Sequence, residues 1–118
     1  MNDVTLPRLL ETMTNLNVQL APTKTPGLWA ANLNGQLFQF ALMPSQAIVR
    51  ADLPGAVSLL RCNEINASGL LVSAAVVADM VRIEHTFPTA AGLADAQLKT
   101  LLSQAIDHIF AAIRTLQP

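Results

Sequence analysis

Cys62, His85 and His108 are the only residues of the sequence that carry a thiol or an imidazole. A cysteine and a histidine could act as nucleophile and base if the helix with Cys62 faced the strand with His85 across a cleft. A free cysteine, however, is more often a small packed side chain than a reactive group. These residues therefore favour structural roles, with catalysis by Cys62 and His85 as the minor alternative.

The spacing of the other polar residues indicates neither a metal site nor a phosphate site. A metal ion needs three or four converging ligands, whereas Asp107 and His108 are neighbours on a predicted helix and point about 100° apart. The five glycines are isolated from one another, so no glycine-rich loop can cradle a phosphate. We expect no catalytic residue, no cofactor and no bound metal.

Among the elements predicted for the fold, the clearest is a meander of three antiparallel strands over residues 28–53. The dipeptide Asn34-Gly35 suits the two positive-φ positions of a type I′ hairpin turn. The resulting register places Trp29 opposite Phe40 on a nearly all-apolar face, which we expect to face the core. The other face is mixed and could be partly covered; it carries Leu28, Ala30, Asn32, Leu37, Gln39, Ala41 and Met43.

Three further segments have apolar residues at helical spacing, and two more strands follow the meander. We expect helices at residues 5–17, at 54–66 and from Ala94 or Asp95 to Leu116. We expect the third meander strand at 47–53, later strands at 70–77 and 80–87, and a linker at 21–27. The order is helix, three strands, helix, two strands, helix. It predicts an α+β fold in a single domain, residues 1–118, with helices packed on one face of an antiparallel sheet.

The composition points to an interface with another chain. Hydrophobic residues make up 52% of the 118 residues and charged residues only 13%, about half of the usual charged share. A monomer of this size would expose much apolar surface, and such surface usually belongs to an interface. We therefore expect a homodimer.

The charges argue against two classes of partner. Seven basic and eight acidic residues are spread along the chain without clustering, so neither nucleic acid nor a membrane surface is expected as a partner. No run of 18 apolar residues and no signal peptide is found, and the lone Cys62 suits a reducing compartment. The expected location is the cytoplasm.

A family resemblance adds to this interpretation. The run LLRCNEIN at residues 59–66, followed by a hairpin, Phe87-Pro88, a small-residue turn and a long helix, resembles the second half of YbjN-type bacterial proteins. That grouping shares its fold with class I type III secretion chaperones. The resemblance implies a non-enzymatic, dimeric protein that binds an extended client. Asn63 and Asn66 match the motif, and they resemble polar groups that satisfy backbone at a helix end.

The sequence and the resemblance together predict a chaperone-like module that binds a protein or an extended peptide. The candidate binding residues lie on the mixed face of the meander: Leu37, Gln39, Ala41 and Met43. A sheet face or edge of this kind can hold a client strand and accept its alternate side chains. The alternative is a small-molecule sensor with a pocket between the sheet and the last helix.

Overall fold

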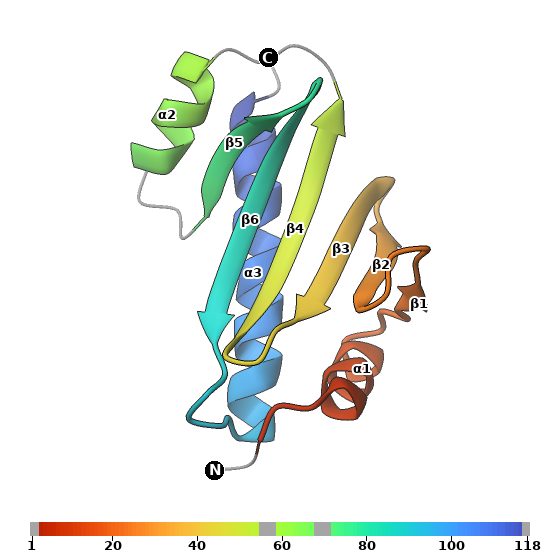
Figure 1. Cartoon of the computed structure of the whole chain (residues 1–118). Helices are drawn as coiled ribbons and strands as arrows, with labels where there is room; N and C mark the ends of the chain where they lie inside the picture. The colour runs from red at the N-terminus through yellow and green to blue at the C-terminus, as the bar shows by residue number, and fades with distance from the viewer. Residues whose placement is uncertain (1–2, 55–58, 68–71, 117–118) are drawn as a thin grey trace.

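The computed structural model describes residues 3–54, 59–67 and 72–116, which form one sheet and the helices that pack on it (Figure 1). The six antiparallel strands lie in the order β1-β2-β3-β4-β6-β5. Along the chain the elements are α1 (Leu6–Asn15), β1 (Ala21–Pro22), β2 (Leu28–Leu33), β3 (Gln36–Leu42), β4 (Gln46–Pro54), α2 (Leu59–Ala67), β5 (Ser73–Val77), β6 (Met80–Pro88) and α3 (Asp95–Leu116). The α+β fold predicted from the sequence is confirmed.

The first helix begins as its sequence predicts, but the linker after it does not stay free of the sheet. The Thr5 hydroxyl caps α1 by accepting a hydrogen bond from the Arg8 backbone N–H at 3.4 Å. The expected linker at residues 21–27 contains β1, which pairs with β2 at Ala30 and Trp29. A proline is tolerated on an edge strand, because no neighbour needs its missing N–H.

The β2–β3 hairpin has the predicted register. Trp29 pairs with Phe40, and the turn residues Asn34 and Gly35 have φ values of 53° and 85°. The Asn32 side chain braces the turn by accepting a hydrogen bond from the Gly35 N–H at 2.9 Å. Trp29 is only half-buried, so it lies at the margin of the core and not at its centre.

The expected start of the second helix at Pro54 is wrong. Pro54 is the last residue of β4, where it pairs with Met80, and α2 begins at Leu59 within the described residues. A proline can occupy either a first helical turn or a strand end, so its preset φ did not decide between them. Parts of the expected helix and of the expected strand at 70–77, namely residues 55–58 and 70–71, lie outside the described residues.

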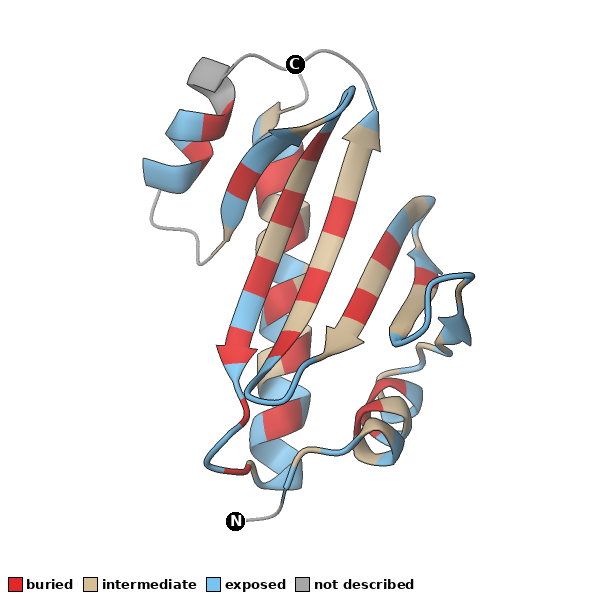
Figure 2. Ribbon diagram, viewed as in Figure 1, coloured by how far each residue is buried: buried red, intermediate tan, exposed pale blue. Residues whose placement is uncertain are grey.

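The core lies between one face of the sheet and the helices. Figure 1 shows α3 running behind β4 and β6, and Figure 2 shows buried and less buried residues alternating along those strands. The buried strand residues include Ala47, Val49 and Ala51 of β4 and Val81, Ile83, His85 and Phe87 of β6. They meet the buried stripe of α3 that the helical spacing predicted: Leu98, Leu102, Ala105, Ile109, Ala112 and Ile113.

The opposite face of the sheet, which we call the outer sheet face, has no described helix over it (Figures 1 and 2). Helix α1 packs against α3, and α2 packs against β5 and α3. The expectation that the sheet could be covered in part on both sides is therefore not met by residues 3–54, 59–67 and 72–116. This leaves the side chains of β3 that alternate with Phe38 and Phe40 available for contact.

Asn66 closes part of the free edge of β5. Its side-chain oxygen accepts a hydrogen bond from the Ala74 N–H at 2.7 Å, and its amide nitrogen donates to the Ala74 carbonyl at 3.1 Å. The amide thus takes the place of a neighbouring strand and satisfies both backbone groups. The expectation that this asparagine serves backbone is confirmed.

Replacing Asn66 by alanine should therefore destabilise the protein by about 1–2 kcal/mol, since both backbone groups of Ala74 lose a partner. Asn63 is exposed on the same helix and provides the matched control, for which Asn63→Ala should cost less than about 0.5 kcal/mol. Urea unfolding of the two variants measures the difference. Equal losses would show that the Asn66–Ala74 pair contributes nothing special.

Candidate protein-binding surface

The four residues singled out from the sequence lie in one row on one face, three of them on β3 and Met43 directly after its end. Leu37, Gln39, Ala41 and Met43 alternate along β3 and its end on the outer sheet face, because Phe38 and Phe40 between them point into the core. The two ends of the row stand out: 51% of Leu37 and 47% of Met43 is exposed. Six residues of extended chain separate them, or about 20 Å.

A polar strip crosses the middle of this face. Arg50 of β4 donates a hydrogen bond from Nε to Gln39 Oε1 at 2.7 Å. Two residue pairs further along the strands, Arg82 of β6 holds both carboxylate oxygens of Asp52 at 2.9 and 3.0 Å. The hydrogen bond to Asp52 is the main reason that the pKa of Arg82 is raised above its ordinary value. The charges of Asp52 and Arg82 are paired across strands, so the surface has polar groups at its centre and apolar ones at its ends.

Other exposed large apolar side chains lie at the far side of the sheet. Val76 is 45% exposed and Met80 36% exposed, and both belong to the hairpin that joins β5 to β6. Met80 lies on the outer sheet face, like Arg82, whereas Val76 pairs with the buried Val81. This apolar group is separate from the Leu37–Met43 row because β4 lies between β3 and the β5–β6 hairpin.

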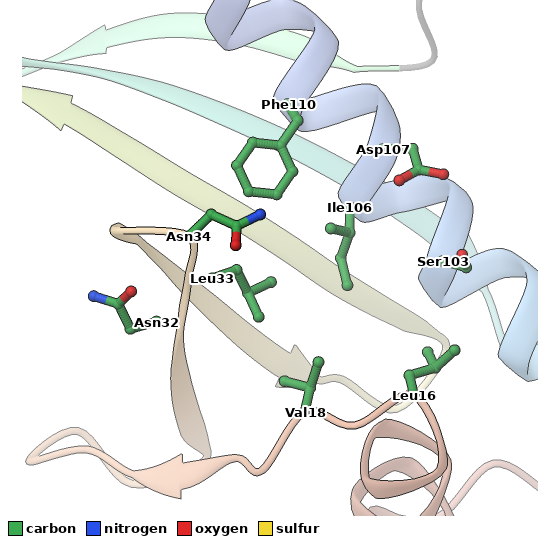
Figure 3. A pocket seen from close by; sticks show the side chains of 9 residues that line it. All are labelled: Leu16, Val18, Asn32, Leu33, Asn34, Ser103, Ile106, Asp107 and Phe110. Carbon is green, nitrogen blue, oxygen red and sulfur yellow. The ribbon is translucent and has the colours of Figure 1, made fainter.

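An open groove of about 430 Å³ lies on the helix side of the β2–β3 turn (Figure 3). We call it the hairpin groove. Its apolar side chains come from the chain after α1, from the hairpin and from α3, and Figure 3 shows them turned toward a common space with polar residues around it. It is lined by Leu16, Val18, Asn32, Leu33, Asn34, Ser103, Ile106, Asp107 and Phe110.

Of the three residues that carry a thiol or an imidazole, the structure brings the two histidines together. Cys62 is buried on α2, and the rings near His85 are those of Phe87 and His108, with ring centroids 6.4 and 5.7 Å away. The Nδ1 atoms of both histidines are buried without a hydrogen-bond partner in the described part of the chain. Within the same residues, no three His, Cys, Asp or Glu side chains are placed to hold a metal ion.

The burial of His85 should make the stability of the protein depend on pH. Burial lowers the pKa of the His85 imidazole from its ordinary value of 6.5, and His108 lowers it further through its charge. The unfolded chain then binds a proton more readily than the folded one. The free energy of unfolding therefore keeps its full value above pH 6.5 and decreases as the pH drops below 6.5.

Urea unfolding at pH 7.5 and 5.5 measures this loss. The His85→Gln variant should lose less stability than the wild type between the two values, because glutamine does not titrate. An equal loss in both proteins would show that other groups cause the pH dependence.

The hairpin groove and the Asn66–Ala74 bracket could not be placed from the sequence. The residues of the groove come from three segments, 16–18, 32–34 and 103–110, which lie 14 and 69 positions apart in the sequence, and no local pattern marks them. The resemblance indicated that Asn66 bonds to backbone, but the sequence did not show that its partner would be Ala74 on β5. Asp107 was considered only as a metal ligand, a role the structure does not support.

Among the described residues, no helix has the length and apolar character needed to cross a bilayer.

Comparison with solved structures gives close matches in fold. The crystal structure of YbjN from E. coli superposes with a TM-score of 0.76 at 17% identity, covering 95% of this chain and 92% of that one. At such an identity the likeness establishes the fold alone.

Two solved complexes contain a chain of the same fold. The ExsC–ExsE complex matches with a TM-score of 0.67 at 14% identity, covering 93% of this chain and 91% of the other. The ExoT–SpcS complex from Pseudomonas aeruginosa matches with a TM-score of 0.62 at 15% identity, covering 99% and 100%. The expected likeness to YbjN and to secretion chaperones is confirmed.

A search of curated protein sequences gave no match. The family model of YbjN, described as "Putative bacterial sensory transduction regulator", matches residues 6–118. This match spans nearly the whole sequence and includes every described helix and strand. The chain therefore belongs to the YbjN family.

Proposed function

We propose that this protein is a non-enzymatic, homodimeric module of the cytoplasm that binds a protein or an extended peptide through the outer sheet face, at Leu37, Gln39, Ala41 and Met43. The observation that carries the proposal is the exposure of Leu37 and Met43 at the two ends of a strand face that no described helix covers. Two large apolar side chains held on a rigid strand can contact a client without rearrangement of the fold.

The structural relatives support a protein as the partner. The ExsC–ExsE, ExoT–SpcS and HopA1–SchA structures are complexes, and the last is a chaperone–effector complex by its own description. The HopA1–SchA structure matches with a TM-score of 0.61 at 11% identity, over 94% of this chain and 98% of that one. A shared fold does not carry a partner with it, so the support lies in the combination of this fold with an exposed apolar row.

The chemistry of the surface indicates how a client would be held. Burying Leu37 and Met43 removes apolar area from water at about 25 cal/mol per Å². The amide of Gln39 is already held by Arg50, so the middle of the row presents a fixed polar group and not a mobile one. Because the charges of Asp52 and Arg82 satisfy each other, affinity should depend mainly on apolar contact and shape.

Site-specific photo-crosslinking in the native host tests the proposal. A photoreactive benzoylphenylalanine at position 37 or 43 should form a discrete adduct with another protein, which mass spectrometry identifies. The same residue at position 11, exposed on α1, is the matched control and should give no such adduct. Adducts of equal yield at all three positions, or adducts with a second copy of the chain alone, would contradict client binding by this face.

The homodimer can be tested separately. The low charged fraction and the exposed Val76 and Met80 at the β5–β6 hairpin supply apolar surface for a second copy near α2. Light scattering coupled to size exclusion at micromolar concentration should give twice the chain mass of 12.6 kDa. The double variant Val76→Lys and Met80→Lys should shift the mass toward that of one chain. A mass of 12.6 kDa for the wild type would show a monomer.

The alternative of a small-molecule sensor needs an enclosed cavity between the sheet and α3. The described residues offer two hollows there, the hairpin groove and one of about 480 Å³ beside Phe87 of β6 and Leu101 of α3, and both are open to solvent. Sites for small ligands usually enclose most of the ligand surface. The geometry therefore favours a polypeptide over a small molecule.

A further inference from the structure

We infer that the hairpin groove binds apolar side chains of an extended segment of a partner protein, and that this segment carries a lysine or arginine opposite Asp107. The inference rests on the proposed function, because it assigns to the same kind of partner a second contact on the helix side of the sheet. It differs from that proposal in its residues, its face and its charge requirement.

The backbone of β2 offers hydrogen bonds beside the groove. The Leu28 carbonyl accepts from the Thr23 N–H at 3.1 Å, so Leu28 faces the β1 side of the strand. Because backbone groups alternate along a strand, Ala30 and Asn32 face the same side. The pairing with β1 ends at Ala30. The N–H and C=O of Asn32 are thus the next outward-facing pair, and Asn32 also lines the groove.

The floor of the groove is apolar and only half-buried. Leu33 points from β2 to the helix side, like Ala31 two residues before it, and faces Ile106 and Phe110 of α3 (Figure 3). Val18 closes the side nearest α1. In an extended segment paired at Asn32, every second side chain would point into this space, and about 430 Å³ accommodates two or three side chains of leucine size.

The rim of the groove carries a negative charge, which favours a partner with a basic side chain. Asp107 is the single charged residue among the nine that line the groove, and it is exposed. Among residues 3–54, 59–67 and 72–116 no cation pairs with it, whereas Asp52 and Asp95 are each held by an arginine. An unpaired carboxylate at the rim of an apolar groove complements a basic side chain that follows an apolar one. This favours a polypeptide over a fatty acid or another small apolar molecule.

Synthetic peptides provide defined probes. Two acetylated ten-residue peptides in which leucine and serine alternate would be compared, one ending in lysine and one in glutamate. Titration into the 15N-labelled protein should move the amide signals of residues 32–34 and 103–110, with tighter binding of the lysine peptide. Asp107→Lys should weaken the lysine peptide by about fivefold, the effect of an exposed ion pair, and reverse the preference.

Filling the groove with a large side chain provides a second test of peptide binding. Ser103→Trp places a large ring in the space and should weaken both peptides more than about tenfold. Gln104→Trp, on the next and more exposed residue, is the matched control and should leave the dissociation constants within about twofold. Native circular dichroism of both variants confirms that each is folded.

The outcomes separate this inference from the proposed function. Peptide-induced shifts confined to residues 37–43, or unchanged affinity in Ser103→Trp, would overturn the groove and leave the outer sheet face as the binding surface. Absence of peptide binding, with octanoate shifting residues 32–34 and 103–110 instead, would overturn it in favour of a small ligand. The crosslinking at positions 37 and 43 tests the proposed function independently of both.

Discussion

Replacing Leu37 and Met43 together by aspartate should weaken partner binding by more than about hundredfold while the protein stays folded. Both side chains are about half exposed, so the folded chain loses little packing when they change. In the complex each aspartate would be a charge without a partner, buried against apolar atoms of the client. Calorimetry with the partner captured by crosslinking measures the loss, on protein with native circular dichroism.

The swap of Leu37→Met with Met43→Leu is the matched control, since it keeps apolar character and nearly the same volume. Its dissociation constant should remain within a few-fold of the wild-type value. If the aspartate variant binds as tightly as the wild type, the partner is held elsewhere on the molecule. If the swap variant also loses binding, the surface depends on a shape more specific than an apolar row.

Phe38→Ala should destabilise the protein by about 3–5 kcal/mol, a large part of the stability of a domain this size. Phe38 is completely buried, and its ring lies 5.0 Å from that of Phe110 and 6.5 Å from that of Phe40. It therefore joins the centre of the sheet to α3, and its removal leaves a cavity between two rigid elements. Urea unfolding gives the loss directly.

Trp29→Ala is the instructive comparison, because Trp29 also faces the core from the hairpin but is only half-buried. Its cost should be clearly smaller than that of Phe38→Ala, although tryptophan is the larger side chain. A greater loss for Trp29→Ala would show that the margin of the core, near β1, contributes more than its centre.

Local patterns predicted the hairpins because the turn chemistry and the alternation agree. Asn34-Gly35 fixes the β2–β3 register, and the alternation along residues 80–87 places Val81, Ile83, His85 and Phe87 in the core. The buried stripe of α3 was predicted equally well, because the apolar spacing repeats over all 22 residues of the helix.

The errors fall where a residue suits two structures. Pro54 fits a strand end as well as a helix start, and Pro22 fits an edge strand as well as a linker. Pairing across the hairpin predicts the face of Trp29, which packs against the core, but not its depth. Tertiary packing decides such cases.

The two candidate binding surfaces also differ in how well the sequence predicted them. The row of Leu37, Gln39, Ala41 and Met43 could be predicted because three of the residues lie on one strand and Met43 directly follows it. The hairpin groove could not, because Leu33, Ile106 and Asp107 meet only after α3 packs behind the sheet. Sites built from one element can be predicted from periodicity, whereas sites built from several require the fold.

The most direct test of the outer sheet face as the client surface is the detection of intermolecular nuclear Overhauser effects. The captured partner would be mixed with protein carrying 13C-labelled methyl groups on leucine and methionine. Contacts from partner protons to the methyl groups of both Leu37 and Met43 are the predicted result. A saturated complex in which neither methyl group contacts the partner would contradict the proposed binding surface.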